Sequence, residues 1–355
     1  MQRASQIEGR GGASPFSVSG RLKRVSIPVA LAAVLVLLFL FSFGLGRYPV
    51  GPANVVKILV SHVLPIDHTW SEAEDTVMMQ IRLPRILASL LVGASLALAG
   101  ASFQGLFRNP LVSPDILGVS AGAGFGAALA ILLSGTTVVV QILAFAGGLV
   151  AVAISYGISR MVRGSTTLSL ILAGMAISSL FGALLSLLKY IADPVDQLPA
   201  ITYWLMGSFA SVDNRDLIFA AIPMLVGMAV LVLIRWRLNV LAMGEEEALA
   251  LGTRTGQVRA LTIVCCTMVT ASSVCISGTI GWVGLVIPHI GRMLVGPNHK
   301  RLIPVSMLLG AAYLLLIDDM CRTAASVEIP IGILTAIVGV PFFVYLLRKS
   351  GRGWA

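Results

Sequence analysis

Long runs of apolar residues, separated by short clusters of charged residues, glycine and proline, set the pattern of this chain. Residues 80–126 show it most clearly, because Arg82 and Arg85 precede a run that carries no charge until Arg108. That run has about twenty residues, enough for a helix rising about 1.5 Å per residue to cross a bilayer core. The Asn-Pro pair that follows favours a turn, and a second apolar segment begins at residue 116. The stretch therefore predicts a membrane hairpin.

The same pattern recurs along the chain and predicts about ten membrane-spanning helices with short connections. The expected spans are residues 27–45, 83–106, 116–134, 138–159, 166–189, 216–235, 258–277, 281–295, 302–317 and 330–347. An amphipathic run at 203–209 fits a short helix at the outer membrane surface. The fold class is therefore all-α, with one transmembrane domain over residues 28–350. Residues 1–27 are rich in Gly, Ser and Arg, and we expect them to form a disordered cytoplasmic tail.

Composition agrees with a membrane protein and excludes a nucleic-acid-binding one. Hydrophobic residues make up 57% and charged residues 12% of the chain, and mean hydropathy is +0.93. The net charge of +9 comes from basic residues that lie mostly at the ends of apolar runs. In the predicted topology, about 18 of the 25 Lys and Arg residues face the cytoplasm, as the positive-inside rule requires. We therefore expect a multi-pass protein of the cell (inner) membrane with both termini cytoplasmic.

The cysteines give no sign of a metal or disulfide site. No Cys-x-x-Cys motif occurs, and three of the four cysteines lie inside one apolar run, where thiols behave as small buried hydrophobes. They are Cys265, Cys266, Cys275 and Cys321. We expect no metal and no cofactor in this chain.

Three arginines are predicted on the extracytoplasmic side, against the positive-inside bias. Arg82 and Arg85 share a helix face, and Arg322 lies at the outer end of the ninth span. One interpretation is that they snorkel to the interface or pair with acidic neighbours such as Asp318 and Asp319. The other is a basic pocket that docks acidic side chains of an extracytoplasmic partner.

The glycines of the third span favour close helix packing. Residues 122–127 match GxGxxA, a dinucleotide-binding fingerprint, but no strand precedes them and no soluble βαβ unit surrounds them. The spacing of Gly118, Gly122 and Gly126 is instead small-xxx-small, which lets helix backbones approach closely in lipid.

The longest predicted inner loop covers residues 237–256 and contains an acidic run framed by glycines. A charge run is by default a solvated surface, but the apolar residues after this one would be costly to leave in water. A short helix pressed against a cytoplasmic partner fits better. The residues assigned to it are Gly244, Glu245, Glu246, Glu247, Ala248, Leu251 and Gly252.

Two absences bear on mechanism. The chain has no GxxxxGK[ST] loop, so it does not hydrolyse nucleotide by itself and we expect no enzyme activity. Ionisable residues in the middle of spans are few, unlike in a proton pump or voltage sensor. His289, beside Pro288, is interpreted as a hydrogen-bonded side chain of the bundle and not as a ligand. The spans therefore look like the wall of a pathway that is powered from elsewhere.

These motifs resemble the permease subunits of type II ABC importers, the FecCD family that moves ferric siderophores, haem and cobalamin. The resemblance covers nearly the whole chain except its first residues and the outer segment 50–78. The matching motifs lie at 82–85 (RLPR), 109–122, 204–208 (WLMGS), 284–289 (GLVIPH) and 328–332 (EIPIG).

The resemblance implies a fold, partners and roles for residues. It implies ten spans in the type II permease fold, a homodimer with the translocation path at its interface, and alternating access. Two cytoplasmic ATPase subunits would bind ATP and Mg, and a substrate-binding protein would dock outside. Its glutamates would meet Arg82, Arg85 and Arg322, and the Gly244–Gly252 segment would be the coupling element for the ATPase.

The cargo stays open at this point. We favour an iron chelate, a ferric siderophore or haem, because it is the commonest cargo of the family and no cluster of cationic residues in mid-span suggests a small oxyanion. Cobalamin and molybdate are the alternatives within the same architecture. The alternative of a different class is an ion-coupled secondary transporter or a channel that needs no ATPase.

Overall fold

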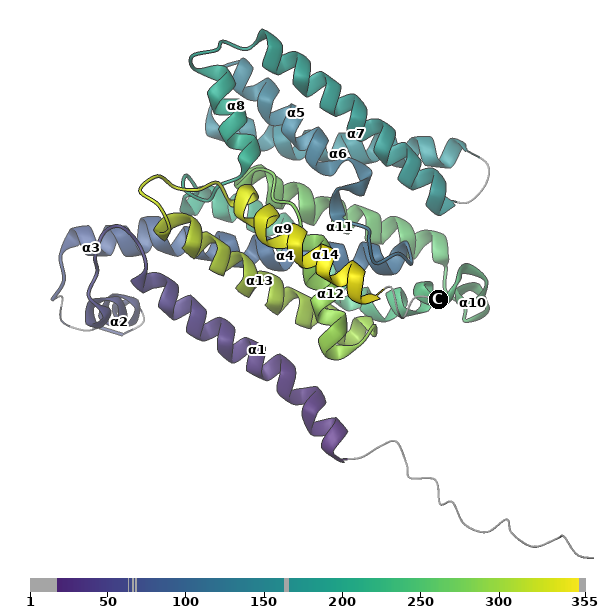
Figure 1. The fold of residues 1–355 in the computed structure, drawn as a ribbon, viewed down its shortest axis with the longest axis horizontal. Helices are drawn as coiled ribbons and strands as arrows, with labels where there is room; N and C mark the ends of the chain where they lie inside the picture. The colour runs from purple at the N-terminus through teal and green to yellow at the C-terminus, as the bar shows by residue number, and fades with distance from the viewer. Residues whose placement is uncertain (1–17, 63, 66, 68, 163–165, 351–355) are drawn as a thin grey trace, which may run out of the picture.

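The computed structural model describes residues 18–62, 64–65, 67, 69–162 and 166–350, and across these ranges the ordered elements are all helical (Figure 1). In chain order these are α1 (Val18–Gly44), α2 (Pro52–Ser61), α3 (Glu72–Thr76), the π-helical turn η1 (Val77–Arg82), α4 (Leu83–Leu106), the 3-10 turn η2 (Pro114–Leu117), α5 (Val119–Leu132), α6 (Thr137–Met161), α7 (Thr166–Ile191), α8 (Gln197–Met206), α9 (Asn214–Met243), α10 (Glu245–Ala250), α11 (Thr255–Ser277), α12 (Val283–Val295), α13 (His299–Thr323) and α14 (Ile331–Ser350).

Every predicted span corresponds to a helix. Among the described residues, seven helices are long and apolar enough to cross a membrane, and the shorter apolar helices α5, α12 and α14 supply the other three. Two of the short helices begin later than predicted, because the residue before each of them has a positive φ angle that does not fit a helix. These residues are Gly118 (φ 89°) before α5 and Trp282 (φ 70°) before α12. The all-α membrane fold predicted from the sequence is confirmed.

Several predicted boundaries were wrong, and for one reason. α9 continues to Met243 and does not end at residue 235, so the inner loop expected at 237–256 shrinks to the α10 region. α13 continues to Thr323, and α1 begins at Val18, inside the predicted tail, whose residues 1–17 lie outside the described ranges. The membrane span within α1, Ile27–Gly44, nevertheless agrees with the predicted 27–45. A charged residue ends the hydrophobic span, but the helix itself can continue into water, or its charged side chains can pair with other groups.

The segments predicted to be extracytoplasmic also contain more helix than the sequence pattern indicated. The segment between the first two spans forms α2, α3 and η1. The short outer helix is α8, Gln197–Met206, and not residues 203–209, because Gly207 (φ 77°) ends it in a conformation that favours glycine.

Helix α4 lies at the centre of the larger helix group, where it packs against α9, α11, α12 and α13 (Figure 1). Glycine makes these approaches possible. A Cβ atom at Gly93 would lie 2.2 Å from the carbonyl oxygen of Gly310 in α13, and one at Gly100 would lie 1.8 Å from that of Gly284 in α12. These two contacts fix how close α13 and α12 come to α4.

A second group contains α5, α6, α7 and α8, which Figure 1 shows above the α4 group. The three glycines singled out in the sequence lie at its start. Gly122 and Gly126 face α6, where a Cβ would lie 2.3 Å from the Gly147 oxygen and 2.0 Å from the Leu143 oxygen. Gly118 has a different position, because its left-handed backbone joins η2 to α5.

We expect Gly100→Ala to lower the melting temperature of the purified protein in detergent. The added methyl group would force α4 and α12 apart, and overpacking of this kind costs about 1–3 kcal/mol. Gly157→Ala in α6 is the matched control, since a Cβ there meets no atom within 4 Å. Equal melting temperatures for the two variants would contradict the close approach of α4 and α12.

Candidate functional site

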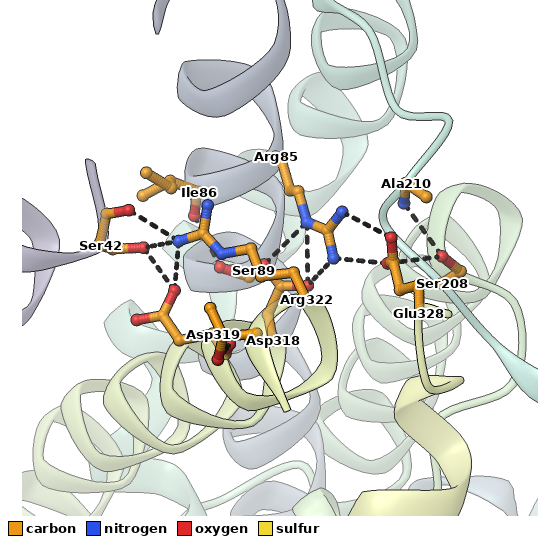
Figure 2. A network of polar contacts seen from close by, with 11 residues as sticks. Ser42, Arg85, Ile86, Ser89, Ser208, Ala210, Asp318, Asp319, Arg322 and Glu328 are labelled. Atoms are coloured by element: carbon orange, nitrogen blue, oxygen red, sulfur yellow. Dashed lines mark hydrogen bonds and ion pairs between the residues drawn. The ribbon is translucent and has the colours of Figure 1, made fainter. Parts of the chain in front are cut away.

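The outer ends of α4 and α13 carry a cluster of arginines and carboxylates (Figure 2). Arg82 ends η1 and Arg85 lies in the first turn of α4, so the two project from neighbouring turns. α13 packs along α4 and contributes Asp318, Asp319 and Arg322 from its last two turns. The connection from α13 to α14 contributes Glu328. We call this set the outer arginine cluster: Arg82, Arg85, Arg322, Asp318, Asp319 and Glu328.

Arg85 is shared by two carboxylates. Its Nε donates to Asp318 Oδ1 and Oδ2 at 3.1 and 3.0 Å, and its Nη2 donates to Asp318 Oδ1 at 2.7 Å. On the other edge of the guanidinium, Nη2 and Nη1 donate to Glu328 Oε1 and Oε2 at 2.6 and 3.2 Å. The Asp318 side chain is fully buried and that of Glu328 is 24% exposed. A buried ion pair of this kind is costly to break, because the remaining partner is left unpaired.

Arg322 ties α13 to the end of α1. Its guanidinium pairs with Asp319 one turn earlier, and its Nη2 donates to the Ser42 carbonyl at 2.8 Å and to the Ser42 hydroxyl. That hydroxyl in turn donates to Asp319 at 2.7 Å. The Arg322–Asp319 pair and Ser42 therefore form a closed network at the outer end of the bundle (Figure 2).

Arg82 differs from the other two arginines because carbonyl groups hold it. Its Nη1 and Nη2 donate to the carbonyl oxygens of Phe43 and Tyr48, both in or just after the end of α1. Among the described residues it forms no ion pair with a carboxylate. Its positive charge is therefore balanced only by the cluster as a whole.

The structure brings together the three arginines that the sequence singled out. All three are buried, and they share the wall of one outer cavity of about 220 Å³ with Glu328 and with Arg47, which is exposed. Two of the three pair with carboxylates of this chain, as one of the two interpretations expected. Sequence reasoning missed Glu328 as part of the site, although its position in the EIPIG motif was a signal.

The acidic segment forms helix α10, at the end of the bundle predicted to face the cytoplasm. Within this helix Ala248 is buried, and Glu245 pairs with Arg259 of α11 at 3.3 Å. Leu249 and Leu251 remain exposed, at 56% and 62%. Gly244 (φ 144°) and Gly252 (φ 73°) frame the helix with backbone that favours glycine. Glu246 and Glu247 are exposed beside the leucines, so the exposed surface of α10 is both acidic and apolar.

No described part of the chain forms a metal site. The ranges that the structure covers contain no group of three or more His, Cys, Asp and Glu side chains placed to hold an ion. All four cysteines are buried free thiols.

Comparison with known proteins gives a consistent picture. The model of the FecCD transport family matches residues 34–349. The molybdate import system permease protein MolB of Haemophilus influenzae is 43% identical over 91% of this chain and 95% of its own length. The cobalamin import system permease protein BtuC of Halobacterium salinarum is 41% identical, over 82% and 78% of the two chains.

A solved structure supports the same assignment. It is described as an inward-facing conformation of a metal-chelate type ABC transporter, and it matches with a TM-score of 0.82 and 42% identity. The match covers 91% of this chain and 99% of the other. The chain therefore belongs to the FecCD transport family and is a multi-pass permease subunit of an ABC importer, not an enzyme.

Proposed function

We propose that the chain forms a homodimer in the cell inner membrane, with both termini in the cytoplasm, and that the dimer imports an iron chelate, a ferric siderophore or haem. Two cytoplasmic ATPase subunits bind ATP and Mg and drive the cycle, and a substrate-binding protein delivers the cargo outside. The observation that carries the proposal is a pair of long, uncharged and incompletely packed helix faces on α7 and α14.

These faces support both the dimer and the cargo. Side chains such as Leu172, Met175 and Leu180 on α7, and Ile337 and Val344 on α14, are more than half exposed. No charged residue occurs in 167–188 or in 331–347. A second copy would cover part of this surface, and the rest would line an uncharged path. A bulky chelate passes such a path without needing a cationic partner, whereas a bare oxyanion finds none there.

Molybdate is the second candidate cargo, because the 43% identical relative is named for molybdate import. Cobalamin is the third, on the name of the archaeal relative. The outer arginine cluster and α10 would serve the same transport cycle whichever of these cargoes is carried. Docking at the outer arginine cluster and closure of the ATPases under α10 would each favour one conformation of the permease, because only differential contacts shift a conformational equilibrium.

Deleting this chain should abolish uptake of a labelled ferric siderophore or haem, and re-expressing it should restore uptake. Cobalamin and molybdate, offered separately to the same cells, serve as internal controls and should enter at unchanged rates. Loss of molybdate or cobalamin uptake alone would move the cargo to that compound and keep the importer. Transport by the purified chain in proteoliposomes without any ATPase would instead support an ion-coupled transporter or a channel.

Reversing the charge of Arg82 should weaken docking of the substrate-binding protein. Arg82→Glu removes the cation that has no carboxylate of its own and places a negative charge in the outer cavity, so the dissociation constant should rise about tenfold or more at low salt. The difference should shrink as ionic strength rises, because salt screens the long-range attraction between the partner's acidic groups and the cavity. Arg215→Glu, an exposed arginine at the outer end of α9, is the matched control. Unchanged docking by Arg82→Glu would leave the cluster with a purely structural role.

Changing the surface of α10 should release the ATPase. We expect Leu251→Ser combined with Glu246→Lys to remove the ATPase subunits from the purified complex, since the two changes delete an apolar contact and reverse a charge on the exposed face. Leu133→Ser is the matched control. It removes another exposed leucine, 69% exposed in the turn after α5, on the other side of the membrane. The α10 assignment fails if both variants retain the ATPase equally well on co-purification.

A further inference from the structure

The two carboxylates on Arg85 are not equivalent. Asp318 is fully buried and receives three hydrogen bonds from Nε and Nη2 of the guanidinium. Glu328 is a quarter exposed, lines the outer cavity, and lies on the connection between α13 and α14. If one carboxylate is to leave Arg85, it is Glu328, because it can move into water without leaving a buried charge behind.

Charge balance favours such an exchange when an acidic side chain arrives from outside. The outer arginine cluster contains three guanidinium groups and three carboxylates, and it is neutral as it stands. A fourth carboxylate entering the cavity would give the cluster a net negative charge with only the exposed Arg47 beside it to offset that charge, which is costly in a largely buried site. Replacement of Glu328 on Arg85 keeps the number of charges and of hydrogen bonds constant.

Glu328 also connects Arg85 to the place where three other helices meet. Its Oε1 accepts a hydrogen bond from the Ser208 hydroxyl at 3.4 Å (Figure 2). The Ser208 amide donates to the Ser277 carbonyl at the end of α11, at 2.9 Å. The neighbouring Gly207 carbonyl accepts the Ile331 amide, the first of α14, at 3.0 Å. Glu328 therefore links α4 to the end of α8, the end of α11 and the start of α14.

Besides the Glu328 link, the start of α14 is held by the buried Ile331 and by its amide hydrogen bond to Gly207. The helix packs against α8, α12 and α13, and one face is left open. Gly332 touches α8 closely, since a Cβ there would lie 2.5 Å from the Met206 carbonyl oxygen. Loss of the Glu328 link would remove one of the contacts that support the start of α14, a helix whose open face borders the proposed path.

We propose that Glu328 is an internal latch, which occupies the position on Arg85 that a carboxylate of the docking partner takes and, when displaced, releases the start of α14. The inference rests on the proposed docking of a substrate-binding protein and names how that docking reaches the transport path. Glu328 acts through Arg85 and Ser208, so it is a positioning residue and does not contact the cargo.

The first arm of the test needs no partner. Hydrogen exchange at the Ile331 amide is measured in the complete importer embedded in nanodiscs, for the wild type and for Glu328→Gln. The neutral amide weakens the contact with Arg85 while Asp318 still balances that arginine, and exchange should become about tenfold faster. Glu72→Gln is the control, because it removes an exposed outer carboxylate outside the cluster. Equal exchange in Glu328→Gln and the wild type overturns the latch.

The second arm measures docking of the separately purified substrate-binding protein to the same importers. Without a competing carboxylate, Glu328→Gln should bind the protein about threefold to tenfold more tightly than the wild type, while its stimulation of ATP hydrolysis should fall. Equal tightening by Glu72→Gln would assign the effect to general electrostatics and overturn the latch.

Wild-type docking should also speed exchange at Ile331, which is fully buried, and unchanged exchange in the docked complex overturns the proposal as well. A wild-type importer that binds no such protein contradicts the proposed function, while the first arm still decides what Glu328 does.

Discussion

The pairing of Arg85 with two carboxylates is the interaction on which the outer half of this permease depends. A buried guanidinium is costly without acceptors for its donors, and a carboxylate partner also balances its charge. Asp318 supplies that partner from α13, and Glu328 adds a second from the connection to α14. One side chain on the central helix thus holds a neighbouring helix and the start of the last one in place.

Close helix packing makes this pairing possible. α13 reaches α4 because Gly93 and Gly310 face each other without side chains, and the same close packing farther along α4 admits α12 at Gly100. Were the helices to pack at the distance that leucines impose, Arg85 would not reach Asp318 with two nitrogens. Small residues in mid-span and charges at the outer end are therefore parts of one arrangement: the glycines set the distance, and the ion pairs fix the register.

The sequence predicted the parts of this arrangement that follow from local pattern. Apolar runs located the spans, and the positive-inside bias placed Arg82, Arg85 and Arg322 together on one side. Helix ends were predicted poorly, because Arg235 or Asp318 ends a hydrophobic run without ending a helix. Glu328 was overlooked for another reason. It lies 243 residues from Arg85 in the chain, and only the three-dimensional path of α13 shows that it arrives at the same guanidinium.

The two ends of the permease are built for different kinds of contact, and this difference gives direction to the cycle. At the outer end, Arg85 and Arg322 are already paired with carboxylates of the chain, so the proposed partner would gain more by exchanging a carboxylate on Arg85 than by adding one there. Such a contact is reversible and sensitive to salt. At the predicted inner end, α10 exposes Leu249 and Leu251 beside carboxylates, and burial of these leucines against the proposed ATPase would give a longer-lived contact. Under the proposed function, the partner outside would bind transiently and the partner inside would stay bound, as an importer powered from the cytoplasm requires.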